Sequence, residues 1–202
     1  MFFHIYFGVM KMKRIKPYIL TGILLVSVLG TFLHFAYNLS GNNLLVGLFT
    51  PVNESVWEHT KLIFFPMLLY GLYMNKKLKR TYPRIYASAI LGAFAGVLFI
   101  IIAFYTYSGI IGYHLAFADI SIFYISVITA FYVTYKKALS RNRAQANWIL
   151  FILCIVMIAL YIVFSIYPPD IPLFANPFAS EKALAGASAF CIEYQEANPL
   201  LH

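Results

Sequence analysis

The chain has 202 residues, of which 62% are hydrophobic and only 11% are charged. A soluble globular domain is about 25% charged, so this composition excludes an ordinary soluble protein and predicts an integral membrane protein. The formal net charge of +8 would suit a nucleic-acid-binding protein. Its basic residues, however, are grouped between long apolar runs, as in the loops of membrane proteins, so no nucleic-acid partner is expected.

Five apolar segments are long enough to cross a bilayer, because a hydrocarbon core of about 30 Å needs about 20 helical residues. We predict an all-α, polytopic bundle of five transmembrane helices over residues 17–36, 57–74, 85–105, 115–135 and 147–167. The organisation expected is a basic cytoplasmic N-terminus (1–16), a five-helix transmembrane domain (17–167) and an extracytoplasmic tail (168–202) to which no structure is assigned.

The basic residues predict the orientation of this bundle. Thirteen of the 15 fall into three clusters and none of the seven acids does. The clusters alternate with the predicted spans: Lys11, Lys13, Arg14, Lys16; Lys76, Lys77, Lys79, Arg80, Arg84; and Lys136, Lys137, Arg141, Arg143. By the positive-inside rule the N-terminus is then cytoplasmic and the C-terminus lies outside.

The second span begins with polar residues. Thr50-Pro51 predicts a helix start, with Thr50 as N-cap and Pro51 in the first helical position. The apolar part that follows, 62–74, is only about 20 Å long at 1.5 Å per residue, which is shorter than the hydrocarbon core. The preceding polar turns are therefore expected within the outer part of the bilayer, facing protein or water, because a charge that faces lipid costs several kcal/mol.

Titratable residues of several spans fall at one depth. Measured from each basic cluster at 1.5 Å per residue, a polar layer is predicted about 26 Å from the inner face. It contains His34, Glu58, His59 and Asp119, with Glu54 at the rim and Tyr105, Tyr107 and His114 slightly higher. Small residues lie on the same helix faces as these polar residues. The stripe Ser88-x-x-x-Gly92-x-x-x-Gly96 predicts a close contact between helices.

The first functional hypothesis is a metal-dependent intramembrane hydrolase or transferase acting on a lipid-linked or outer-leaflet substrate. Histidine nitrogens and carboxylate oxygens suit a divalent metal, with zinc favoured, and leave one position open for water. The candidate ligands are His34, His59, His114 and Asp119. The candidate catalytic residues are Glu54, Glu58, Lys61, Tyr105 and Tyr107, with a carboxylate as general base and a tyrosine stabilising an oxyanion.

Three alternatives stay open. Glu58, His59, Lys61 and Asp119 would also suit a proton- or cation-coupled transporter. The polar layer would equally suit a non-catalytic partner subunit in which it fixes helix register. A purely structural interpretation makes the acids an interfacial first helical turn, with a Glu58–Lys61 pair at i,i+3. No H-E-x-x-H motif is present, and the oligomeric state is not indicated.

Several short motifs also suggest a family. N-E-S-V-W-E-H-T-K-L, F-F-P-M-L-L-Y, the upstream H-F-A-Y and the downstream Y-T-Y-S-G and A-D-I are the relevant segments. Together they resemble an uncharacterised family of small five-span membrane proteins of Gram-positive bacteria that carry an N-E-S-x-W-E-H motif. The resemblance extends over residues 15–177. It implies a multi-pass protein of the bacterial plasma membrane and no particular activity.

Overall fold

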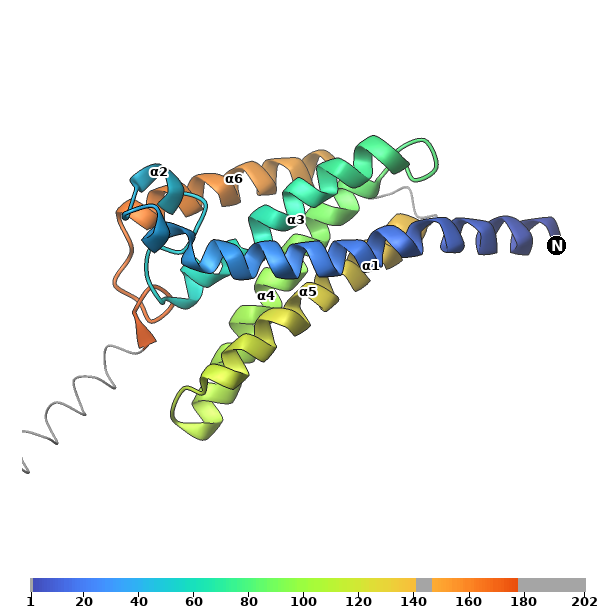
Figure 1. Ribbon diagram of the computed structural model, residues 1–202. Coiled ribbons are helices and arrows are strands. Elements are labelled where there is room, and N and C mark those ends of the chain that lie inside the picture. The colour runs from blue at the N-terminus through green and yellow to red at the C-terminus, as the bar shows by residue number, and fades with distance from the viewer. Residues whose placement is uncertain (1, 141–146, 178–202) are drawn as a thin grey trace, which may run out of the picture.

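The fold is a bundle of helices, seen here in a computed structural model that describes residues 2–140 and 147–177 (Figure 1). Over these residues the chain forms six helices and no strand. They are α1 (Phe2–Leu39), α2 (Leu44–Gly47), α3 (Val56–Leu78), α4 (Ile85–Ile111), α5 (Ala116–Leu139) and α6 (Asn147–Ile166). The all-helical fold is therefore confirmed, and each predicted span has a long helix as its counterpart. The short helix α2 was not predicted.

Four of the long helices have the length and apolar composition needed to cross a membrane. These candidate spans are Lys13–Leu39, Ile85–Ile111, Ala116–Leu139 and Trp148–Ile166. Large apolar side chains on them are exposed, for example Leu24, Ile128 and Ile155. An apolar outer surface of this kind indicates a membrane protein, because it would be unfavourable in water.

Helix α3 is not among these four candidates, and its surroundings explain why. Sixteen of its 23 residues are buried, and it contacts α1, α4, α5 and α6. A helix enclosed by other helices has no need of an apolar surface toward lipid, so polar residues in its first turns are tolerated. Helix α3 is therefore the central element of the bundle.

Helices α4 and α5 pack closely along the predicted stripe of small residues. A Cβ on Gly92 would overlap the Thr134 hydroxyl and the Ala130 carbonyl oxygen of α5. The Thr134 hydroxyl also lies 3.3 Å from the Ser88 carbonyl oxygen. The predicted packing role of the stripe is confirmed, because absent side chains allow the two backbones to approach.

Replacing Gly92 with alanine is expected to destabilise the fold by about 1–3 kcal/mol, because the added methyl group forces α4 and α5 apart. Gly109→Ala is the matched control on the same helix, since a Cβ there meets nothing within 4 Å. Thermal unfolding in detergent micelles measures both. Equal unfolding midpoints for the two variants would contradict the packing interpretation.

The two ends of the bundle differ in composition. The N-terminal half of α1, the α3–α4 turn and the C-terminal end of α5 lie at one end (Figure 1), and basic residues of all three clusters lie in these segments. The C-terminal end of α1, residues 40–55 and residues 167–177 lie at the other end. Toward this second end α5 diverges from α1 (Figure 1).

Helix α3 begins later than predicted. Thr50-Pro51 is not its start: the N-cap is Ser55, whose hydroxyl accepts a hydrogen bond from the Glu58 N–H. The Asn53 side chain accepts from the Ser55 N–H at 2.9 Å, which stabilises a turn just before the helix. Residues 51–55 are therefore non-helical, and the direction of the Glu54 side chain is set by this turn.

Candidate metal centre

Three predicted site residues come together at the second end of the bundle. His34 of α1, Glu54 of the turn and His59 of α3 each offer one ligand atom, and these atoms lie within 4.8 Å of one another. The imidazole centroids of the two histidines are 5.1 Å apart, and His59 Nε2 is 3.3 Å from Glu54 Oε2. These three residues are called the His–Glu–His group below.

The backbone decides how His59 is presented. Its Nδ1 lies 2.9 Å from the Ser55 carbonyl oxygen. A carbonyl oxygen only accepts, so Nδ1 carries the proton and Nε2 is the nitrogen that faces Glu54. A neutral imidazole would then point a lone pair at a carboxylate oxygen, which is unfavourable. The contact is favourable only with one more cation between the two groups, either a proton shared by the ring and the carboxylate or a metal ion.

His34 reaches this position because α1 approaches α3 closely one turn earlier. A Cβ on Gly30 would lie 2.6 Å from the Leu62 carbonyl oxygen and 2.5 Å from the Phe123 ring. Only glycine therefore fits between α1, α3 and α5 at this point. The close approach places the next residue on the same face of α1, His34, beside His59.

The electrostatics of Glu54 follow from its histidine partners. The pKa of the Glu54 carboxyl is lowered, chiefly because the His59 side chain hydrogen-bonds to it, with charges on His59 and His34 adding to the effect. Burial of the carboxyl acts in the opposite direction and is outweighed. Glu54 is thus held as a carboxylate, the form that binds a cation.

The His–Glu–His group lies at the wall of a cavity of about 440 Å³. Asp119 of α5 lines the same cavity, and the remaining walls are mostly apolar. Those walls include Phe35, Ile100, Phe104, Ile120, Phe123 and Tyr124. A cavity with a few polar groups on one side and apolar walls elsewhere is typical of a binding site for a small molecule.

Asp119 is held by a tyrosine. The Tyr107 hydroxyl of α4 donates a hydrogen bond to Asp119 Oδ1. The aspartate is near enough for its charge to act on the His59 imidazole, but it does not belong to the His–Glu–His group. Asp119 is therefore a second carboxylate of the same cavity, and Tyr107 contacts the cavity through it.

Two predicted site residues lie further away. The His114 ring stacks on Phe104 at a centroid distance of 5.0 Å. His114 and Tyr105 line a separate, smaller cavity of about 210 Å³ beside the α4–α5 connection. The structure does not bring either of them to the His–Glu–His group.

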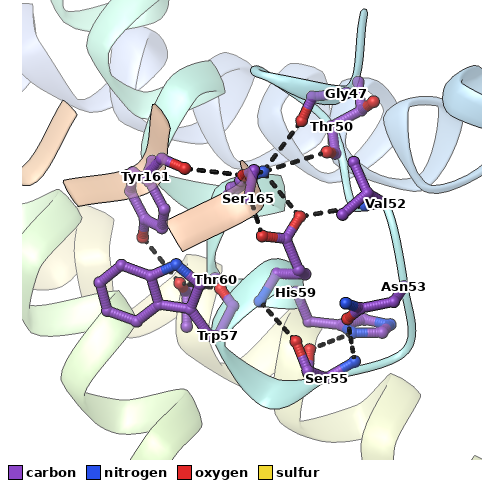
Figure 2. Close-up of polar contacts among 12 residues, drawn as sticks. Gly47, Thr50, Val52, Asn53, Ser55, Trp57, His59, Thr60, Tyr161 and Ser165 are labelled. Atoms are coloured by element: carbon purple, nitrogen blue, oxygen red, sulfur yellow. Dashed lines mark hydrogen bonds and ion pairs between the residues drawn. The ribbon is translucent and has the colours of Figure 1, made fainter. Parts of the chain in front are cut away.

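Glu58 and Lys61 form a different centre, here called the buried ion-pair cluster together with Ser165 of α6 (Figure 2). Lys61 Nζ lies 2.6 Å from both Glu58 Oε2 and Ser165 Oγ. Ser165 Oγ is in turn 3.1 Å from Glu58 Oε1. Because His59 is about 100° around the helix from Glu58, the cluster and the His–Glu–His group occupy different faces of α3.

The buried ion-pair cluster also holds the chain between α2 and α3. Lys61 donates to the carbonyl oxygens of Gly47 at 2.9 Å and Thr50 at 3.3 Å. Glu58 accepts from the Val52 N–H at 3.0 Å (Figure 2). Glu58 and Lys61 are both buried and do not line the cavity, so a substrate in the cavity does not reach them. Their contacts instead fix the segment that carries Glu54.

The sequence interpretation did not include Ser165. One signal for it exists: Ser165 follows Tyr161 by one helical turn in an otherwise apolar helix, so both face the same side. Tyr161 Oη lies 2.7 Å from the Thr60 hydroxyl of α3.

The beginning of the predicted tail packs against the start of α3, where Phe174 contacts Trp57 and the Leu173 carbonyl oxygen accepts from the Trp57 N–H. Residues 178–202 of that tail lie outside the described residues.

Comparison with known proteins yields a family. No curated protein matches the chain, and no solved structure matches it. The model of a family of unknown function, DUF6512, matches residues 8–183. This match covers the helical bundle with both polar centres and agrees with the resemblance to an uncharacterised family. The chain belongs to the family of unknown function DUF6512.

Proposed function

We propose that this protein is a metal-dependent membrane hydrolase or transferase whose divalent-metal site is the His–Glu–His group. The proposal rests on the contact of His59 Nε2 with Glu54 Oε2 at 3.3 Å, which a bound cation would stabilise. His34 lies close enough to supply a third ligand to the same cation. Two imidazole nitrogens and one carboxylate oxygen are a ligand set used by catalytic zinc, which keeps its fourth position for water.

The chemistry follows from the residues around that site. A bound zinc ion would lower the pKa of its water to about 7 and polarise a substrate carbonyl or phosphoryl oxygen. Asp119 supplies a carboxylate in the same cavity that is suited to act as general base, and Tyr107 positions it. Glu54 thereby takes the role of ligand, and Asp119 takes the role of base.

A coupled transporter is less well supported. That hypothesis used Glu58, His59, Lys61 and Asp119, and it needs Glu58 and Lys61 to exchange protons or cations with a pathway. Both side chains are buried, paired with each other at 2.6 Å and absent from the cavity lining. A pair held this tightly is better suited to fixing structure than to relaying ions.

Metal analysis of the purified protein tests the metal site. We expect one zinc ion per chain, and we expect His59→Ala to lower zinc affinity by more than the roughly 10–100-fold that loss of an outer-shell partner costs. His114→Ala is the matched control, because it removes a histidine of the same end of the bundle without touching the His–Glu–His group. Absence of stoichiometric metal, or equal loss in both variants, would contradict the site.

The orientation belongs to the same proposal. If α3 crosses the membrane together with the four candidate spans, the bundle has five crossings. The N-terminus would then lie in the cytoplasm of a bacterium, and the His–Glu–His group would lie beneath the outer face of its plasma membrane. The gathering of the basic segments at the opposite end of the bundle supports this (Figure 1).

Cysteine labelling tests the orientation in a variant whose own cysteines are replaced. A membrane-impermeant maleimide added to intact cells is expected to label Leu45→Cys, which is 71% exposed at the site end. Lys79→Cys, exposed in the turn at the opposite end, should react only after the cells are opened. The reverse pattern would show that the site faces the cytoplasm.

A further inference from the structure

We infer that the cavity is a lipid-chain site: the substrate is a membrane lipid whose chain enters sideways between α1 and α5 while its polar group lies against the His–Glu–His group. The inference deepens the proposed function and relies on it only for the chemistry at the polar group. It rests on the position of the cavity mouth, on the distribution of polar groups and on the size of the cavity.

The exposed side chains of the cavity lining lie on two apolar helices, and we take the mouth of the cavity to lie between them. Its lining includes Phe35 of α1 and Ile120 and Tyr124 of α5, which are 55%, 57% and 41% exposed. Both helices are candidate membrane spans, and they diverge at this end of the bundle (Figure 1). In a bilayer the medium outside these side chains is lipid, and a lipid enters between α1 and α5 past the hydrogen bond of 3.2 Å between the Thr31 and Tyr124 hydroxyls.

The wall changes from polar to apolar across the cavity. His34, Glu54, His59 and Asp119 supply its ionisable groups, whereas Ile100 and Phe104 of α4 form a buried apolar wall. This arrangement matches a molecule with one polar and one apolar part. A fully polar substrate would leave the apolar walls without a partner, and a fully apolar one would leave the ionisable groups without solvation.

The size of the cavity excludes a larger occupant. About 440 Å³ falls within the range of roughly 300–1,000 Å³ that is typical of small-molecule sites. A helix of a partner protein has a diameter of about 10–12 Å with its side chains and would not fit inside. A single hydrocarbon chain is narrow and flexible, so it follows the apolar wall.

The selectivity among lipids is expected to depend on the polar group rather than on the chain. A hydrocarbon chain that moves from the bilayer into an apolar cavity exchanges one apolar surrounding for another and gains little free energy. The free energy of binding therefore comes from the contact of the polar group with the His–Glu–His group. Lipids that differ in head group are expected to differ more in binding than lipids that differ in chain length.

Photolabelling tests this site in phosphatidylglycerol vesicles that contain a trace of phosphatidylglycerol with a diazirine on its acyl chain. Every lipid-facing residue is labelled in such vesicles, so the informative positions are buried ones. Ile100 and Phe104 are 6% and 9% exposed and line the cavity, whereas Val97, one turn away on α4, is 5% exposed and does not. We expect severalfold more label on Ile100 and Phe104 than on Val97.

Two tryptophan variants of α5 sharpen the test. Ile120→Trp fills the mouth and should reduce labelling of Ile100 and Phe104 severalfold. Ile128→Trp is the matched control, because Ile128 is 53% exposed on the same helix and does not line the cavity. Labelling of Ile100 no stronger than that of Val97, or labelling unchanged by Ile120→Trp, would overturn the inference.

Zinc content measured on the same samples separates this inference from the proposed function. If Ile100 is labelled and the protein holds no metal, the lipid-chain site stands and the metal proposal fails. If zinc is present and Ile100 is not labelled, the metal site stands and the lipid-chain site fails.

Discussion

Replacing Lys61 with methionine is expected to lower the free energy of unfolding by about 3–5 kcal/mol, because removal of one partner leaves the other charge buried and unpaired. The Glu58 carboxylate would lose its cation at 2.6 Å, and the carbonyl oxygens of Gly47 and Thr50 would lose a donor. Methionine has a similar length and no charge, so loss of packing contributes little. Chemical or thermal unfolding in detergent micelles measures the change.

Two further variants show whether the pair itself is responsible. Lys76→Met removes an exposed lysine of the same helix and should leave the unfolding midpoint within experimental error. The double variant Glu58→Met/Lys61→Met should lose less than the sum of the single variants, because neither charge is then left alone. If the single losses simply add, the two side chains do not act as a pair.

The buried ion-pair cluster and the His–Glu–His group are connected through the backbone. Lys61 holds the Gly47 and Thr50 carbonyl oxygens, and Glu58 holds the Val52 N–H. Two residues after Val52 the chain reaches Glu54, whose carboxylate contacts His59. The ion pair therefore sets the position of the proposed carboxylate ligand and is a positioning element for the metal site.

The helices and the common level of His34 and His59 could be predicted because both depend on distance along the chain. Apolar runs of about 20 residues mark helices that cross a bilayer, and a rise of 1.5 Å per residue converts sequence separation into depth. On this basis His34 and His59 were expected at one level, and their rings are 5.1 Å apart. Neither estimate needed information on tertiary contacts.

The start of α3 could not be predicted because two N-cap signals compete. Thr50-Pro51 and Ser55 both satisfy the local rules for a helix start. A helix from Thr50 would place the Thr50 carbonyl oxygen in its first intrahelical hydrogen bond. In the structure that oxygen accepts from Lys61 Nζ, a contact between residues 11 positions apart. A tertiary interaction thus decides a local boundary.

This boundary changes the composition of the site. In a helix that began at Thr50, Glu54, Glu58 and Lys61 would share one face, at spacings of i, i+4 and i+7. Because residues 51–55 are not helical, Glu54 turns instead toward His59 at 3.3 Å. The residues of the polar layer were predicted, but their division into two centres depends on a turn that the pattern did not reveal.

Replacing Asp119 with asparagine is expected to reduce turnover by about 10²–10⁴-fold, the usual contribution of a general base, while zinc content stays unchanged. Asparagine has the same shape and still accepts the Tyr107 hydrogen bond, but it does not take up a proton. Mass spectrometry of a total lipid extract incubated with the protein measures loss of substrate and release of product. Wild-type protein that turns over no lipid of the extract would count against the hydrolase.

Asp170→Asn is the matched control for Asp119→Asn, because it removes an exposed aspartate that does not line the cavity. It should retain wild-type turnover. Tyr107→Phe should show an intermediate loss, since it leaves the Asp119 carboxylate in place without the hydrogen bond that orients it. Loss of zinc in Asp119→Asn would instead make Asp119 a metal ligand and leave Glu54 as the carboxylate available to act as base.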